Sequence, residues 1–500
     1  MELVFQEDQM EYLCNVLSES VTQEQTADVV IPDSYPDAER IVDVFGTVLV
    51  RSEECAAGSA GVAGFVQAGV LYVSPDGQLR KVQTEIPFSV RRDFATQDQC
   101  FLQCRCTLSS VDGRILNSRK LLLRAGISCA MDVYAPKTFS AFDVAEAAPN
   151  MQLKRKKIPM QMPMAVGEKS FVLNEELELP SDKPEISHLL KCLYRTQVQE
   201  QKMVGDKAVF KGNLLIHVLY ESGDGSLYSH DWTIPFSQYA ELGRQLDECA
   251  AQTVLTLTGA DTEPDGQLDS RRLLTSINIL AQCMALGVAE IAFVEDAFCT
   301  DAEFVPQWYE DKMTGILDRQ HVRETAAMQK ELPVKNVVDA WVYPRQECKQ
   351  RISDQLQVEL PLCCHVLYQD TEGQLQFESL QMPVMLQTEL CENARCCLRE
   401  TELGSAFATA GNGNISLRVP VTVLLESYAE QPVRGICGGE INPLEKSTEA
   451  RPGVILRFAN ETEDVWDVAK DCKTTVDAIR QANNLTGDSV PADTLLLIPM

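Results

Sequence analysis

Three stretches of the chain repeat one another at a step of 148 residues, and this repeat limits the possible folds more than any other feature. Each stretch has a Leu-Tyr pair, a glycine-containing turn and a proline-containing end. The tyrosines are Tyr72, Tyr220 and Tyr368. So long a step corresponds to a whole domain and not to a solenoid unit. The chain is therefore expected to contain tandem globular modules.

The pattern inside each repeat predicts a β-hairpin. Apolar side chains alternate with others from Leu214 to Tyr220, and the two other repeats do the same, which indicates a strand with one buried face. Gly77, Gly225 and Gly373 follow, and glycine readily takes the positive φ of a hairpin turn. A second turn signal later in each repeat predicts another hairpin. The expected fold class is mainly β, and the pattern leaves a sandwich and a small barrel both open.

These patterns distinguish seven segments of the chain. Three β modules are expected, at 27–134, 171–298 and 331–429, and the third diverges from the other two. Residues 1–26 are acidic and partly amphipathic, which predicts a helix. Residues 300–330, with Trp308 and Tyr309, are expected to form a charged helical connector. The Gly- and Pro-rich residues 430–453 predict a flexible linker before a small terminal domain at 454–500.

Charge and hydropathy exclude several classes of partner. With 44 basic and 73 acidic residues the formal charge is −29, so nucleic acid and anionic membrane surfaces are not expected partners. The basic run 154–157 is interpreted as a solvated linker or strand end. No segment has the ~20 apolar residues of a membrane span. No basic residue precedes Arg40, so no signal peptide is expected and the chain is placed in the cytoplasm.

No residue pattern indicates catalysis. The 18 cysteines lack paired zinc-site spacing and are interpreted as reduced, small hydrophobic residues. Phosphate-binding loops, dinucleotide fingerprints and hydrolase motifs are missing from the sequence. His217 and His365 share one repeat position, where the first module has Gly69, which favours a packing or surface role. No catalytic, cofactor or metal residue is therefore predicted. An undetected hydrolase has only the cysteines and histidines in its favour.

The terminal domain has a recognisable pattern. A strand from Val454, two short helices and a final strand ending at Pro499 are expected within 47 residues. With Trp466 in the first helix and Asn-Asn-Leu after the second, the pattern resembles a LysM domain. LysM domains grip N-acetylglucosamine polymers between two loops, which correspond here to 462–464 and 484–491. The resemblance implies a groove formed by Thr462, Glu463, Asp464, Val465, Asn484, Leu485 and Pro491. Trp466 itself is expected to be a core residue.

The repeats and the terminal pattern together resemble one family. The opening segment 29–37, the Leu-Tyr and Ile-Pro-Phe-Ser units and a C-terminal LysM pattern are similar to SPOCS-domain, SipL-like spore-envelope morphogenetic proteins of spore-forming clostridia. The resemblance implies a noncatalytic scaffold on the mother-cell side of the forespore envelope. It also implies that the LysM domain docks onto the coat-basement ATPase or another coat protein. The alternative is an adaptor whose LysM domain holds peptidoglycan strands, and the expected lack of export favours the first reading.

Overall fold

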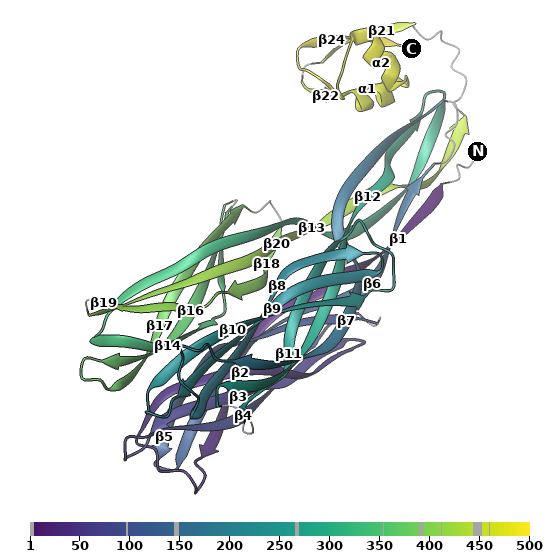
Figure 1. The fold of residues 1–500 in the computed structure, drawn as a ribbon. Coiled ribbons are helices and arrows are strands. Elements are labelled where there is room, and N and C mark those ends of the chain that lie inside the picture. Colours follow the sequence, from purple (N-terminus) through teal and green to yellow (C-terminus); the bar gives the residue numbers. More distant parts are fainter. Residues whose placement is uncertain are drawn as a thin grey trace.

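The molecule is built almost entirely of β-strands, with two short helices near the C-terminus (Figure 1). The structure is a computed structural model. It describes residues 5–96, 99–144, 150–265, 270–353, 355–389, 394–411, 413–443, 453–459 and 461–500. The mainly β class predicted from the sequence is confirmed.

Three pairs of antiparallel sheets, which we call modules 1 to 3, account for most of the chain. In module 1 the sheets contain β2 (Arg40–Ala56), β3 (Ser59–Val73) and β4 (Leu79–Asp93), and β1 (Gln6–Val30), β6 (Lys120–Asp143) and β5 (Phe101–Asn117). In module 2 they contain β8 (His188–Val204), β9 (Lys207–Glu221) and β10 (Leu227–Glu241), and β7 (Met151–Glu178), β12 (Arg272–Cys299) and β11 (Ala250–Pro264).

Module 3 is divided into more strands. Its sheets contain β14 (Val334–Pro344), β15 (Cys348–Ile352), β16 (Gln355–Asp370) and β17 (Leu375–Glu389), and β13 (Ala302–Glu331), β20 (Asn414–Pro443), β18 (Arg395–Leu403) and β19 (Phe407–Gly411). A single pairing, Ile316 with Gln161, joins the second sheets of modules 2 and 3 into one seven-stranded sheet. In modules 2 and 3 the two sheets enclose an apolar core, and the core of module 1 extends onto side chains of both other modules.

The predicted hairpins have the same geometry in all three modules. The repeated tyrosine lies in the first hairpin strand and is paired across the turn in each case. Gly77, Gly225 and Gly373 have φ values of 80°, 80° and 82°, a region that residues with a Cβ rarely occupy. These turns therefore require glycine.

One paired position explains a difference between the repeats. Gly64 lies opposite Phe88 in module 1, and a Cβ there would meet the Phe88 ring at 2.9 Å. Module 2 has the same glycine–phenylalanine pair. In module 3 the pair is Leu360 and Val384. The glycine and the phenylalanine are thus replaced together, because the larger Leu360 leaves room only for a side chain smaller than phenylalanine on the opposite strand.

The helix predicted for residues 1–26 is wrong. Residues from Gln6 onward form the long strand β1, which pairs with β6 as far as Val30. Exposure alternates from Val21 to Val29, with period two. Tertiary pairing along a complete neighbouring strand overrides the weak local preference for a helix.

The helical connector predicted for 300–330 is also wrong. This segment is β13, paired with β20 from Ala302 to Glu331. Arg434 of β20 stacks on Trp308, and Tyr309 packs edge-on against Phe142 of β6. Most of its charged residues lie on the exposed face of the strand, so the same sequence is compatible with a strand and with a helix.

The flexible linker predicted for 430–453 begins too early. Strand β20 continues to Pro443, and residues 444–452 lie outside the described part of the chain. The glycines that suggested flexibility allow close packing instead. A Cβ at Gly435 would lie 2.8 Å from the Tyr309 ring, and one at Gly439 would lie 2.4 Å from the Phe304 ring.

The ends of the long strands form a common extension, which we call the stalk. One apolar cluster joins side chains of β1, β6, β7, β12, β13 and β20, including Tyr12, Phe139, Met162, Phe293 and Met313. In Figure 1 β12 extends beyond the sheets toward the small C-terminal domain. The stalk therefore connects the three modules to the terminal domain.

The terminal domain has its own core. Strand β21 (Val454–Ala459) pairs with β24 (Thr494–Pro499), and β22 (Glu463–Asp464) pairs with β23 (Ser489–Val490). The helices are α1 (Val465–Cys472), with Asp464 as its N-cap, and α2 (Val476–Asn483), with Thr475 as its N-cap. Their buried faces pack with the inner faces of β21 and β24.

Candidate functional site

The two loops assigned to the LysM-like groove lie side by side. Glu463 pairs with Val490 and Asp464 with Ser489 in the short ladder of β22 and β23. The backbone N–H of Val465 also donates to the carbonyl of Asp488, at 2.8 Å. Segments 462–464 and 484–491 therefore meet on one side of the domain.

The predicted groove residues have different environments. Thr462, Asn484 and Pro491 are exposed, and Asn484 takes the left-handed conformation that ends α2. Leu485 is half-buried against the domain core, and Val465 is fully buried. The remaining acidic pair, Glu463 and Asp464, is half-buried. Only the exposed residues are free to contact a ligand directly.

One of the two loops is held against the stalk. Lys154 of β7 donates to the Asp464 carboxylate at 2.9 Å. The indole N–H of Trp466 donates to Asp296 of β12 at 2.8 Å, and its ring packs edge-on against Phe298. Trp466 is 8% exposed, which places it in the interface with the stalk. The basic run 154–157 lies in strand β7, and its Lys154 makes the contact with Asp464. The sequence feature that could have indicated this contact is the presence of one basic cluster in an acidic chain.

The modules meet at a buried charge cluster. Lys191 donates to Asp43 at 2.5 Å and to Asp339 at 2.7 Å, and its side chain is 2% exposed. The three residues occupy the same repeat position, each 148 residues from the next. Equivalent strands of modules 1, 2 and 3 thus converge on one point. Sequence reasoning missed this cluster.

Two histidines complete the cluster. The ring of His217 lies 2.6 Å from Asp339 and 2.5 Å from Asp231. Burial opposes the charged form, but Asp339 and Asp231 raise the pKa of His217 to about 9. His365 lies 3.6 Å from Asp43. Its pKa is also raised to about 9, because its interaction with Asp43 outweighs burial.

The charges of this cluster balance. Protonated His217 and His365 with Lys191 give three positive charges, against Asp43, Asp231 and Asp339. Burial would raise the pKa of Asp339, but Lys191 and His217 hold it well below its usual range. A buried ion cluster is tolerated only when its charges are paired. In module 1 the ring of Phe45 fills the space beside Gly69, where a histidine would otherwise lie.

One cysteine lies against this cluster. The pKa of Cys363 falls to about 7, because the neighbouring His365 outweighs the effect of burial. The thiol also lies 3.2 Å from the hydroxyl of Ser379. Cys363 is only 2% exposed. The thiol and imidazole are therefore enclosed by protein and contribute to the internal charge balance.

Further polar contacts cross each module boundary. The Asp132 carboxylate of β6 accepts a hydrogen bond from Arg399 of β18 at 2.5 Å. Burial alone would raise the pKa of Asp132, but Arg399 and Arg105 outweigh it and lower the pKa to about 2. Arg195 of β8 donates to the carbonyls of Val342 and Leu403, both at 2.9 Å. The bond between Asp132 and Arg399 connects module 1 to module 3, and the bonds of Arg195 connect module 2 to module 3.

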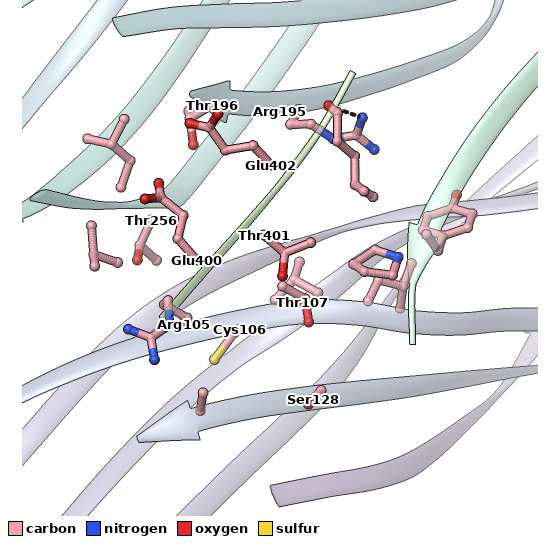
Figure 2. Close-up of a pocket in the computed structure, with 18 of the residues that line it drawn as sticks. Arg105, Cys106, Thr107, Ser128, Arg195, Thr196, Thr256, Glu400, Thr401 and Glu402 are labelled. Atoms are coloured by element: carbon pink, nitrogen blue, oxygen red, sulfur yellow. Dashed lines mark hydrogen bonds between the residues drawn. The ribbon is translucent and has the colours of Figure 1, made fainter. Parts of the chain in front are cut away.

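A cavity of about 290 Å³ lies at this junction, lined by strands of all three modules. Figure 2 shows Glu400 and Glu402 projecting to the same side of β18, with Arg105 and Arg195 also in view. Burial and the neighbouring Glu402 raise the pKa of Glu400 to about 7. The cavity thus has acidic and basic groups at different points of its wall.

The described part of the chain has neither a metal-binding cluster nor a membrane-spanning helix. Across the ranges given above, no group of three or more His, Cys, Asp or Glu side chains has the arrangement needed to hold a metal ion. In the same part of the chain, neither helix has the length and apolar character needed to cross a membrane.

Comparison with known proteins gives one match. Residues 185–256 match the family model described as SipL, SPOCS domain. A SPOCS domain is present in this chain. The matched range contains β8, β9 and β10 of module 2, and with them Lys191 and His217. No curated protein and no solved structure matches the chain. The match suggests a function related to sporulation.

Proposed function

We propose that this chain is a noncatalytic scaffold of the spore envelope, in which the modules form a rigid body and the terminal domain docks onto a coat protein. The observation that carries the proposal is the SPOCS-domain match over residues 185–256. The sequence resemblance to SipL-like proteins, which includes the LysM-like terminal domain, also supports the proposal. The coat-basement ATPase is the partner that the resemblance implies.

The module junction supports a scaffold role. Lys191 is buried and forms ion pairs with Asp43 and Asp339, which hold the modules in one arrangement of surfaces. Separating them would leave charges in an apolar interface, which is costly. A rigid body of this kind can hold several partners at defined distances.

The terminal domain supports docking onto a protein. Part of its groove wall is already engaged, because Lys154 bonds Asp464 and Asp296 bonds Trp466. The domain carries four basic and eight acidic residues. A glycan polymer would have to enter beside the stalk, whereas a protein partner can use the remaining surface.

The test is the placement of fluorescent fusions in sporulating cells. We expect the full chain to encircle the forespore and a chain lacking residues 454–500 to remain folded but spread through the mother cell. Circular dichroism of the purified truncated protein checks that the modules are intact. Normal placement of a folded truncated chain would contradict the proposal.

The alternative, a peptidoglycan-binding adaptor, is favoured by the exposure of Thr462, Asn484 and Pro491 on the two groove loops. Co-sedimentation of the full chain with insoluble peptidoglycan distinguishes the two functions. Pelleting that N-acetylglucosamine oligomers compete away would favour the adaptor. No pelleting of the folded protein would favour docking onto a coat protein.

A further inference from the structure

The two-stranded sheet of the terminal domain carries large apolar side chains on both faces. On its inner face Leu496 and Ile498 are fully buried under the helices. An antiparallel sheet with one solvated face normally carries polar side chains on that face. Here the outer face carries Val454, Leu456 and Phe458 on β21 and Leu495 and Leu497 on β24, all 39 to 65% exposed. We call these five residues the outer patch.

The outer patch is continuous. Leu456 is paired with Leu497, and Phe458 with Leu495, so the side chains form adjacent cross-strand contacts on one surface. The chain's other large exposed apolar residues in the described ranges include Val288 and Phe407, which lie on separate strands of the body. An apolar patch of several contiguous residues marks an interaction surface.

The patch is separate from the contact with the stalk. The stalk binds Asp464, Trp466 and Lys470, which lie at the start of α1 and along it. The helices pack on the inner face of the sheet, so the outer face points away from α1. Docking of the terminal domain on the stalk therefore leaves the outer patch uncovered.

Its dimensions fit one helix. Two strands about 4.8 Å apart make a ribbon about 10 Å wide, which is close to the diameter of an α-helix. Six residues of strand extend about 20 Å, a length that roughly 13 helical residues cover. The open edge of β24 is partly filled, because the Asn483 side chain bonds both the N–H and the carbonyl of Leu497. Packing onto the face is thus favoured over adding a strand at this edge.

The charge around the patch indicates the partner's composition. Asp493 immediately precedes β24, and Glu461 follows β21, so both lie at the Phe458–Leu495 end of the sheet. Both are exposed, and neither forms an ion pair within the described residues. An apolar helix with lysine or arginine at its flanks complements such an acidic border.

A second copy of the chain fits less well. Five half-exposed side chains amount to an area on the order of 400 Å², whereas a stable interface buries about 800 Å² on each partner. Each copy also has a formal charge of −29, so two copies repel each other at low salt. The same charge opposes an anionic membrane surface.

We infer that the outer patch of the β21–β24 sheet binds an amphipathic helix of a partner protein, with its apolar face on the sheet and basic residues toward Asp493 and Glu461. This inference rests on the proposed docking function and assigns it to a surface other than the LysM-like groove. The bound helix would complete a three-layer arrangement of helices, sheet and helix.

The test uses the full chain and two synthetic helical peptides with the same leucine face, one flanked by lysine and the other by glutamate. We expect the lysine peptide to bind in a fluorescence anisotropy titration and the glutamate peptide to bind far more weakly. The double variant Leu456→Thr/Leu495→Thr should bind the lysine peptide at least about tenfold more weakly. Threonine keeps strand propensity and leaves the charge unchanged.

Two control variants complete the experiment. Val288→Thr removes an exposed apolar side chain from β12 and should leave binding unchanged. Asp493→Asn removes one border charge and should weaken binding about two- to threefold while reducing its salt dependence. Asparagine tolerates the positive φ of 60° at this position.

Three outcomes would overturn the inference. The first is that the folded variant Leu456→Thr/Leu495→Thr binds the lysine peptide as tightly as the unaltered chain does. The second is that the unaltered chain self-associates and the variant does not. The third is that the unaltered chain binds phosphatidylglycerol vesicles and the variant does not. The placement assay separates this inference from the proposed function. Normal placement of Leu456→Thr/Leu495→Thr with misplacement of the truncated chain would overturn only the use of the outer patch.

Discussion

The module junction and the terminal domain are joined to the rest of the molecule in opposite ways. At the junction, Lys191 and its two aspartates are almost fully buried and form ion pairs with one another. The terminal domain is held to the stalk by partly exposed contacts of Lys154, Asp296 and Trp466, and it leaves an apolar face open. The junction residues form their ion pairs within the chain, whereas the terminal domain carries the exposed apolar surface that we propose binds a partner.

The largest effect is expected from removing the central cation. Lys191→Met leaves Asp43 and Asp339 buried without a partner amine, which should lower the free energy of unfolding by roughly 3–5 kcal/mol. Urea denaturation followed by tryptophan fluorescence measures the change. Lys312→Met is the matched control, because its contact with Glu430 is exposed and its loss should cost at most about 1 kcal/mol. Equal effects of both changes would contradict the assigned role of the cluster.

Alkaline pH should weaken the junction alone. The pKa of His217 is about 9 in the folded chain, above the ordinary 6.5, so its stabilisation is complete below pH 6.5 and is lost as pH rises through 9. His365 behaves in the same way. The pKa of Cys363 is lowered to about 7, so its contribution to the stability of the folded chain grows between pH 7 and 9 and offsets part of the loss from the histidines. The net loss is on the order of 3 kcal/mol between pH 6.5 and 9.

Unfolding by urea at a series of pH values tests this loss. His217→Gln should flatten the decline between pH 7 and 9. The terminal domain contains no histidine, so it provides an internal comparison. A decline that persists in the variant would assign the pH dependence to other groups.

A smaller effect is expected from Arg195. Arg195→Leu removes donors from the carbonyls of Val342 and Leu403 and a stacking contact with Trp341, which should cost roughly 1–3 kcal/mol. Thermal unfolding measures the loss. Arg195→Lys, which keeps the charge but not the fork of donors, should recover only part of it. Full recovery by lysine would mean that charge alone holds modules 2 and 3 at this point.

The smallest effect on stability belongs to the terminal domain. Asp296→Asn weakens the bonds to Trp466 and Lys470, which are partly exposed, so global stability should change by less than about 1 kcal/mol. The domain should nevertheless separate from the stalk more often. Small-angle X-ray scattering should then give a larger radius of gyration, and Asp301→Asn is a control at the same strand end. An unchanged radius with a large loss of stability would reverse the comparison drawn above.

Much of the strand pattern could be predicted from the sequence, because it is local. Alternating apolar residues and a turn glycine determine each hairpin without distant contacts. The charge cluster depends on contacts between modules, which periodicity does not describe. A signal was nevertheless present, since Asp43, Lys191 and Asp339 each interrupt an apolar run at the same repeat position. Charged residues of opposite sign at equivalent buried positions indicate that the positions meet.

The incorrect predictions share a physical cause. Residues 1–26 and 300–330 have charged, partly amphipathic sequences that suit a helix when considered alone. Each becomes a strand because a complete partner strand, β6 or β20, lies beside it. Likewise, Gly435 and Gly439 suggest flexibility in isolation, yet aromatic rings pack against them. For the groove, the sequence located both loops but could not reveal that the stalk covers one side.

The mixed charge at the centre also bears on how such a chain could have arisen. Three separate, identical modules would place either three carboxylates or three amines at the convergence point, and both arrangements repel. Covalent linkage lets the middle copy carry Lys191 while its neighbours carry Asp43 and Asp339. Once the copies had diverged in this way, the middle module could not replace either neighbour without placing like charges together at the centre. The centre of the molecule thus preserves the position of its middle repeat.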